Sequence, residues 1–205
     1  MSVSPLPFSL VAVVSLLIHG MAAAATLSVS VTDAAGRPLP DAVVMLEPAS
    51  GRLPVKPMAG VEVGQAARQF TPAVTVVTVG TPVSFPNHDT VRHHVYSFSP
   101  AKTFELKLYA GVPATPVVFD KPGVAVLGCN IHDQMAAWII VVDTPHFART
   151  AAAGTAPLAG VAPGHYRLKA WHPSLPADVA PSATPITLGA DDQSTTVRLA
   201  SRAAP

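Results

Sequence analysis

The sequence has little charge and a single cysteine, and both shortages exclude classes of function. Asp, Glu, Lys and Arg together make up 12% of the 205 residues, and 13 basic residues against 12 acidic ones leave a formal net charge of +1. Proteins that bind nucleic acid or an anionic membrane surface rely on a basic excess, so neither partner is expected. Because Cys129 has no second cysteine in the chain, an internal disulfide is excluded as well.

Amphipathic runs of helix-forming residues are scarce after the first 25 residues, which argues against a helical core. Instead, 22 prolines and 13 glycines separate short valine-rich segments. Residues 27–32 read Leu-Ser-Val-Ser-Val-Thr, the period of two that is typical of a half-buried strand. Such segments predict an all-β sandwich, with a low-complexity linker within 143–157. We expect strands within residues 27–32, 42–46, 61–69, 70–87, 95–98, 102–109, 117–119, 124–127, 138–142, 165–171 and 194–199.

Motifs of catalytic sites are missing too. The sequence contains no Ser-His-Asp order, Gly-rich phosphate loop, HExxH motif or pair of CxxC motifs. We therefore predict that the protein is not an enzyme. A catalytic pair of Cys129 and His132 is the one enzymatic alternative.

The N-terminus has the pattern of a targeting segment. The apolar run Phe8–Ile18 is too short to span a bilayer, and the small residues of Ala22–Ala25 that follow suit cleavage. We expect a signal peptide over residues 1–25, cleaved near Ala25, export to a bacterial periplasm, and no membrane span in the mature chain. No Lys or Arg precedes the apolar run, and a retained N-terminal anchor is the alternative.

Export makes the lone cysteine informative, because a free thiol in an oxidising compartment needs burial, a metal or a partner thiol. Cys129 is followed by His132 and Met135 in one short loop. One cysteine, two histidines and a weak axial methionine are the ligands of a blue-copper electron-transfer site. The loop supplies three of these four ligands. The second histidine would come from a cluster of three upstream: His88, His93 and His94.

The two ends of the chain resemble carboxypeptidase-regulatory-like and transthyretin-like β-sandwich domains. The pattern Val-x-Asp-x-x-Gly-x-Pro-Leu-x-x-Ala-Val-Val begins at Val31, and Pro-Gly-x-Tyr-x-Leu begins at Pro163. We divide the chain after residue 25 into an N-terminal β segment (26–60), a copper-binding unit (61–143) and a C-terminal β segment (144–205). Either the end segments form one small sandwich around the copper unit, or the copper domain carries an appended β module.

The segment from residue 70 to residue 142 resembles cupredoxins, and among them it looks most like amicyanin. The spacing Cys129-x2-His132-x2-Met135 matches the short ligand loop of amicyanin, and Pro122-Gly123 precedes the cysteine at the family's distance. The Val-Gly-x-x-Val-x-Phe pattern over residues 79–85 precedes the histidine cluster, as in the family. The resemblance implies a cupredoxin-like Greek-key β-sandwich with one type 1 copper ion.

Within the histidine cluster, the resemblance favours His93, because Asn87 lies six residues before it and Val95 follows it. His94 is the next choice. The resemblance thus implies four copper ligands: His93, Cys129, His132 and Met135. The backbone N–H of His94 and the region of Asn87 would hydrogen-bond around the Cys129 sulfur and tune the reduction potential.

The sequence also departs from the family. Two tyrosines that precede the cysteine in cupredoxins are replaced by Ala125 and Leu127, Gly128 comes directly before the cysteine, and His94 stands where the family has Asn. These changes leave all four ligands in place. They are expected to alter the packing around copper, the copper affinity and the potential.

The resemblance implies a carrier that passes single electrons between periplasmic partners, a dehydrogenase or a c-type cytochrome, through the exposed edge of His132. The whole chain is also similar to exported proteins labelled as methylamine-utilisation proteins. Two other functions stay open. The protein could bind or deliver copper without redox cycling, or it could be a structural β-sandwich with a vestigial site. Delivery would use exchangeable extra ligands: Met58, His88 and His94.

Overall fold

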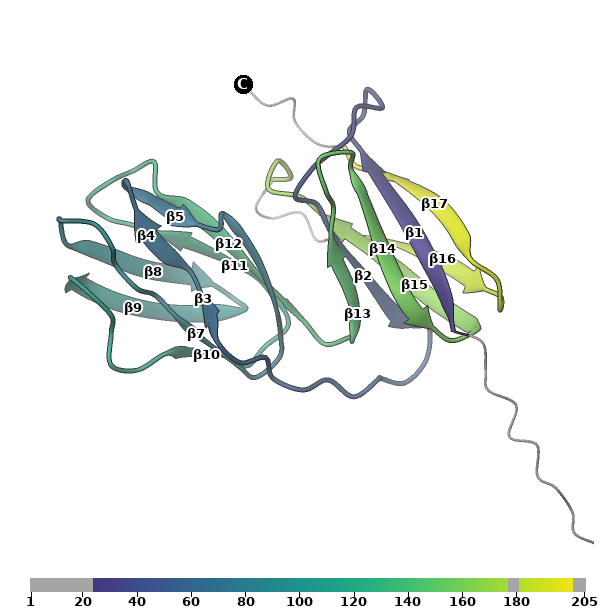
Figure 1. Ribbon diagram of the computed structural model, residues 1–205, viewed down its shortest axis with the longest axis horizontal. Coiled ribbons are helices and arrows are strands. Elements are labelled where there is room, and N and C mark those ends of the chain that lie inside the picture. The colour runs from purple at the N-terminus through teal and green to yellow at the C-terminus, as the bar shows by residue number, and fades with distance from the viewer. Residues whose placement is uncertain (1–23, 177–180, 201–205) are drawn as a thin grey trace, which may run out of the picture.

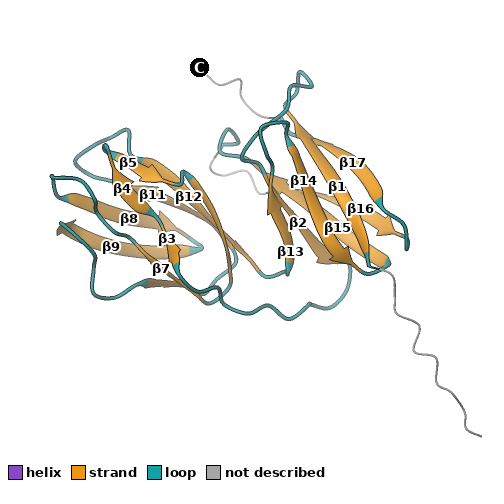
Figure 2. Ribbon diagram, viewed as in Figure 1, coloured by secondary structure: helices purple, strands orange, loops and turns teal. Residues whose placement is uncertain are grey.

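The computed structural model describes residues 24–176 and 181–200, and every regular element in these ranges is a β-strand (Figure 2). The predicted all-β class is therefore confirmed. Most of the predicted signal peptide, residues 1–23, lies outside the described residues. In the part of the chain that is described, no helix is long and apolar enough to cross a membrane.

The strands fall into two groups, which Figure 1 shows as two neighbouring sandwiches. The first sandwich contains β3 (Val61–Glu62), β4 (Gly64–Ala66), β5 (Gln69–Thr71), β6 (Val74–Thr78), β7 (Thr81–Ser84), β8 (His93–Ser99), β9 (Lys102–Tyr109), β10 (Val117–Phe119), β11 (Gly123–Gly128) and β12 (Ala136–Val142). The second contains β1 (Ala25–Thr32), β2 (Val43–Pro48), β13 (His146–Arg149), β14 (Thr155–Val161), β15 (Gly164–Trp171), β16 (Ser182–Leu188) and β17 (Gln193–Arg198).

In the first sandwich, a five-stranded sheet of order β6-β12-β11-β8-β9 packs on a three-stranded sheet of order β10-β7-β3, with β4 and β5 as a separate hairpin. Side chains of both sheets build one core, which includes Val83, Phe85, Phe119, Leu127 and Ile139. Alternate residues of the strands point into this core because successive side chains of a strand face opposite sides. Burying each large apolar side chain stabilises the fold by about 1.5–3 kcal/mol.

The second sandwich joins the beginning of the chain to its end. β1 pairs with β14 on one side and runs parallel to β17 on the other, while the second sheet has the order β13-β2-β15-β16. Its core includes Leu27, Val29, Leu46, Leu158 and Leu168. The chain leaves this sandwich after β2, builds the first sandwich, and returns at β13 (Figure 1).

The prediction of a linker within residues 143–157 fits only residues 150–154, which form a turn, because β13 and the start of β14 lie on either side of them. β13 pairs with β2, and β14 pairs with β1, so the partners lie far earlier in the chain, as His146 opposite Leu46 and Leu158 opposite Leu27 show. The Thr150 hydroxyl donates to the Leu39 carbonyl (2.6 Å) between the two strands. The strands on either side of this turn were missed because long-range pairing, which local propensity does not reveal, decided their structure.

β16 was also missing from the expected strands, because Pro185 lies in its middle. Proline cannot donate a ladder hydrogen bond and is confined mainly to edge strands. β16 is such an edge: it is the last strand of the order β13-β2-β15-β16 and pairs only with β15 among the described strands.

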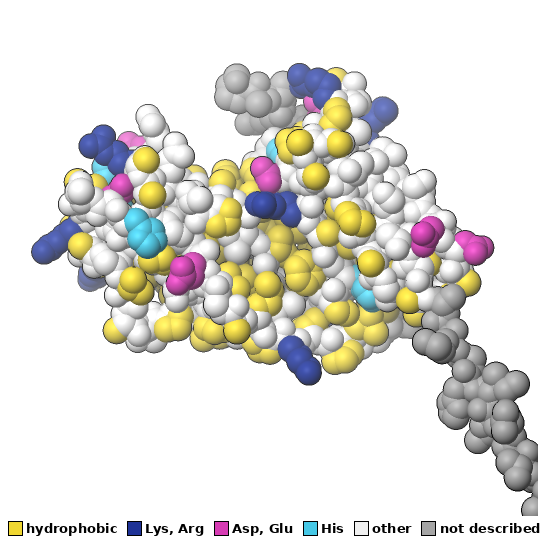
Figure 3. Space-filling view, viewed as in Figure 1, with side chains coloured by type: hydrophobic (Ala, Val, Ile, Leu, Met, Phe, Trp, Pro, Cys, Tyr) yellow, Lys and Arg dark blue, Asp and Glu magenta, His cyan; other side chains and the backbone are white. Residues whose placement is uncertain are grey.

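The two sandwiches share an apolar junction. Val43, Met45 and Trp171 of the second sandwich form one buried cluster with Val74 and Ile140 of the first. The rings of Trp138 and Trp171 lie 6.3 Å apart across it, with an interplanar angle of 53°. Figure 3 shows hydrophobic side chains gathered where the two lobes meet.

Candidate metal centre

Three predicted ligands come together at one end of the first sandwich. His93, Cys129 and His132 each offer one donor atom, and these atoms all lie within 4.8 Å of one another. His93 is 0% exposed and Cys129 is buried, while His132 is partly exposed. A cluster of two imidazoles and a thiol is a set that binds soft or borderline metals.

Strand alternation places His93 and Cys129 in the same core. Val95 and Ser97 of β8 are buried like His93, and Ala125 and Leu127 of β11 are buried like Cys129, which directly follows this strand. β8 and β11 are neighbours, and Gly128 pairs with Tyr96. The inward sides of the two strand ends therefore meet.

A tight turn places the remaining ligands. The backbone N–H of Met135 donates to the His132 carbonyl (2.9 Å), so the loop after Cys129 folds back on itself. Met135 is buried in the same core cluster as Cys129. The Nδ1 atom of His132 is buried and has no hydrogen-bond partner among the described residues. Such an atom needs an explanation, and a metal bond supplies one.

The separation of the His93 and Cys129 donor atoms fits a metal ion. The Cys129 sulfur lies 3.9 Å from Nδ1 of His93. An ion bound at about 2.0 Å from nitrogen and about 2.3 Å from sulfur bridges atoms up to about 4.3 Å apart. With the buried thioether of Met135 in the same core, the set contains the donors of a blue-copper site.

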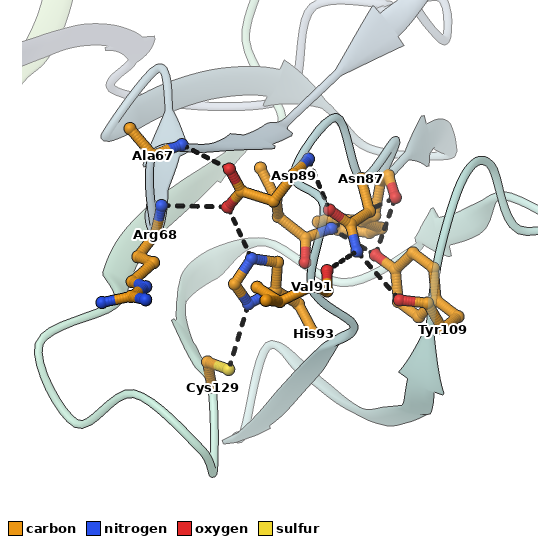
Figure 4. Close-up of polar contacts among 10 residues, drawn as sticks. Ala67, Arg68, Asn87, Asp89, Val91, His93, Tyr109 and Cys129 are labelled. Carbon is orange, nitrogen blue, oxygen red and sulfur yellow. Dashed lines mark hydrogen bonds and ion pairs between the residues drawn. The ribbon is translucent and has the colours of Figure 1, made fainter.

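Sequence analysis did not reveal a carboxylate that contacts the His93 ring on the side away from Cys129. Oδ2 of Asp89 lies 2.6 Å from Nε2 of His93 (Figure 4). The Asp89 carboxylate also accepts the backbone N–H groups of Ala67 (2.7 Å) and Arg68 (2.9 Å). The Arg68 hydrogen bond, followed by the contact with His93, holds the pKa of Asp89 below its ordinary value. A carboxylate partner makes Nε2 the protonated nitrogen, so that the lone pair of Nδ1 faces Cys129.

Asn87 shapes the turn that carries Asp89. Its side-chain amide donates to the carbonyls of Val91 and Tyr109, both at 2.9 Å, and its side-chain oxygen accepts the backbone N–H of Asp89 (2.9 Å). Figure 4 shows Asn87 turned toward Tyr109 and away from the sulfur. The expected hydrogen bond from the Asn87 region to Cys129 is therefore not found among the described contacts. An Asx turn at Asn87 was the sequence signal that could have pointed to Asp89.

His94 lies on the other face of β8. Its Nε2 is 3.0 Å from Oε1 of Glu105 without the alignment of a hydrogen bond, and its ring meets Tyr96 edge-on at 5.7 Å. Because His94 alternates with His93, it is outside the cluster, and no hydrogen bond from its backbone to the sulfur occurs among the described contacts. His88 is exposed and also outside the cluster.

Burial also affects a tyrosine close to the site. Tyr109 pairs with His93 across β9 and β8, and its hydroxyl donates to the Phe85 carbonyl (2.7 Å). Gln65, which is fully buried, donates to the same hydroxyl. Burial raises the pKa of Tyr109 to about 12, so that it stays neutral beside the cluster.

Steric crowding explains why a glycine precedes the cysteine. A Cβ atom added to Gly128 would lie 2.7 Å from Cζ of Tyr96, too close for an undisturbed contact. The Tyr96 ring therefore covers the backbone beside Cys129 from the neighbouring strand. The tyrosines that precede the cysteine in cupredoxins are absent here, but the ring of Tyr96 in β8 lies next to the backbone before Cys129.

No family model and no curated protein matches the chain. Among solved structures, a reduced variant of amicyanin is 21% identical with a TM-score of 0.37, over 41% of this chain and 83% of that one. A novel purple cupredoxin from Nitrosopumilus maritimus is 21% identical with a TM-score of 0.35, over 40% and 99%. A copper-containing nitrite reductase from Thermus scotoductus is 23% identical with a TM-score of 0.38, over 55% and 28%. Each of these likenesses to amicyanin and other copper proteins is partial.

Proposed function

We propose that this protein binds one copper ion in a type 1 site and carries single electrons between redox partners in a bacterial periplasm. The convergence of His93, Cys129 and His132 within 4.8 Å is the observation that supports it best. The buried nitrogen of His132, which has no protein partner among the described residues, adds to it.

His93, Cys129, His132 and Met135 would hold the ion, and copper supplies a one-electron couple when it is bound. The residues themselves keep water out, because the cysteine, the methionine and His93 are all buried. Asp89 keeps the Nδ1 lone pair of His93 directed at the cluster. His93 begins β8 and Cys129 directly follows β11, so paired strands anchor both donors.

His132 is the route by which electrons would leave. It is the only partly exposed member of the His-Cys-His cluster, and Ile131 beside it is 46% exposed. An exposed apolar side chain next to the ligand suits a small and transient interface of the kind that redox proteins form. A dehydrogenase and a c-type cytochrome are the proposed partners, and the protein itself is proposed to catalyse no reaction.

The delivery alternative has less support, because its extra ligands do not converge. His88 and His94 are both outside the described cluster of His, Cys, Asp and Glu side chains. His94 is engaged with Glu105 and Tyr96.

Copper loading of the purified protein tests the proposal. Addition of Cu(II) is expected to give the intense visible colour of a thiolate-to-copper charge transfer. A Cys129→Ser variant should bind weakly and stay colourless. A colourless copper-bound protein, or a Cys129→Ser variant that keeps the colour, would refute the ligand assignment.

A further inference from the structure

A cleft of about 900 Å³ runs along the junction of the two sandwiches. One wall is the outer face of β8, β11 and β12, and the other is the segment around Trp171 and Leu175 of the second sandwich. Ligand sites are commonly clefts of about 300–1,000 Å³ that form between domains. The size and the place of this cleft match that description.

Aromatic side chains come from both walls. Tyr96, Phe98 and Trp138 contribute from the first sandwich, and Trp171 from the second. Phe98 is 77% exposed, although a phenylalanine ring gains free energy when it leaves water. Its ring lies 5.1 Å from that of Tyr96 at an interplanar angle of 37°, so two adjoining aromatic faces form a platform. A flat ring placed on this platform would gain stacking contacts.

The lining has almost no charge. Among the described residues that line the cleft, Asp133 is the only charged one, and none of them is a Lys, Arg or His. An anion would therefore meet no positive partner and one negative one. Polar groups gather at the end near Cys129, where the Tyr96 hydroxyl, Asn130 and Asp133 lie. They could accept from or donate to a hydroxyl or carbonyl group of a ligand.

The cleft does not suit an extended peptide. Peptides that add to a sheet need the free backbone groups of an edge strand. Here the wall is the face of the sheet, and both β11 and β12 lie in its interior, with partners on each side. A ligand without a hydrogen-bonding backbone fits such a wall better.

We propose that this cleft binds an uncharged aromatic molecule that carries a hydroxyl or carbonyl group, such as a phenol, naphthol or quinone. Because Cys129 and Met135 line one end of the cleft while their side chains are buried in the core, the bound ring would lie beside the loop that carries these ligands. The proposal rests on the cleft alone and is independent of whether copper cycles between oxidation states.

The two tryptophans of the chain provide a direct readout, since Trp138 and Trp171 both line the cleft and the chain has no others. In a ¹⁵N–¹H spectrum of the metal-free full chain, addition of 2-naphthol should shift both indole N–H signals in a saturable way. Calorimetry should give the same dissociation constant. Unchanged indole signals up to the solubility limit would overturn the proposal.

Two comparisons locate the site and define its chemistry. Phe98→Ala removes an exposed ring and should weaken naphthol binding about 3- to 10-fold, the size of one aromatic contact. Val118→Ala, at an apolar position on the opposite sheet that is 45% exposed, should leave it unchanged. Naphthalene-2-sulfonate should bind at least about 10-fold more weakly because the lining has no cation. Equal binding to Phe98→Ala, or equal binding of the sulfonate, contradicts the proposed site.

Discussion

Asp89 and His93 face each other at 2.6 Å, and this contact decides which nitrogen of the histidine points at Cys129. Asp89 itself accepts the backbone N–H groups of Ala67 and Arg68, so the carboxylate that contacts the imidazole is tied to a second loop. A carboxylate that contacts a metal-binding histidine in this way orients the ligand in many proteins and raises its basicity.

Replacing Asp89 by Asn should therefore weaken copper binding while leaving the ligands intact. We expect the affinity for Cu(II) to fall by about 10- to 100-fold, because the charge that supports His93 is lost. The reduction potential should rise, since the oxidised and more positive ion loses more stabilisation than the reduced one. Competition with a chelator measures the affinity, and voltammetry measures the potential.

Asp120→Asn is the matched control for that experiment. Asp120 is a carboxylate of the same sandwich that pairs with Lys102 at 3.0 Å, at an exposed position. It is absent from the metal-binding cluster, so its replacement should change neither the affinity for Cu(II) nor the reduction potential. If Asp89→Asn behaves like Asp120→Asn, Asp89 has no part in holding the site.

The two neighbouring histidines should differ sharply. His93→Ala removes a ligand and should reduce copper affinity by more than the 10- to 100-fold expected for an outer contact. His94→Ala should leave affinity within about 3-fold and keep the colour, because its ring is engaged with Tyr96 and Glu105 on the other face. Chelator competition and the visible spectrum distinguish the two. Loss of colour in His94→Ala alone would reverse the assignment.

Sequence reasoning was strongest where structure is local. The alternation of residues 27–32 predicted a strand that the structure places at Ala25–Thr32. The spacing of Cys129, His132 and Met135 suggested one loop, and the turn between His132 and Met135 is local as well. Strand alternation also separated His93 from His94, because adjacent side chains of a strand point to opposite faces.

Contacts between distant segments were the part that could not be predicted. Asp89 reaches His93 only because a separate hairpin supplies the backbone of Ala67 and Arg68. β13 and β14 were missed since their partners lie at the beginning of the chain. The packing of Tyr96 on Gly128 depends on strand register, which no single sequence pattern specifies.

That packing leads to a stability prediction. Gly128→Ala would place a methyl group 2.7 Å from the Tyr96 ring and should lower the free energy of unfolding by about 1–3 kcal/mol. In a Tyr96→Ala background the same change should cost much less, since the two residues are in contact. Urea unfolding of the wild-type protein, the two single variants and the double variant gives the coupling energy between positions 96 and 128.

Gly189→Ala is the control, because a Cβ there would meet its nearest neighbour at an ordinary 3.5 Å. Additive effects of Gly128→Ala and Tyr96→Ala would show that the ring does not restrict position 128.

Asp33 should make stability depend on pH. Its carboxylate accepts the backbone N–H of Arg37 (2.8 Å), and this bond is the main cause that holds its pKa below the ordinary value. A lowered folded-state pKa stabilises the protein above the unfolded-state pKa, and the effect is lost as pH falls through the folded-state value. Asp33→Asn should therefore destabilise the protein at neutral pH, with a difference that disappears in acid.

Urea unfolding at neutral and acidic pH checks this, with Asp191→Asn as an exposed carboxylate that changes the net charge equally. A difference between the wild-type protein and Asp33→Asn that persists unchanged in acid would mean that the carboxylate charge is not responsible.

A redox titration of the copper-loaded protein tests the proposed electron carrier most directly. Visible absorption is followed while electrons are added and then withdrawn. We predict that one electron per chain removes the colour, that reoxidation restores it fully, and that the cycle repeats without loss of copper. Copper that stays coloured on reduction, or that leaves the protein when it is reduced, would contradict an electron-transfer function.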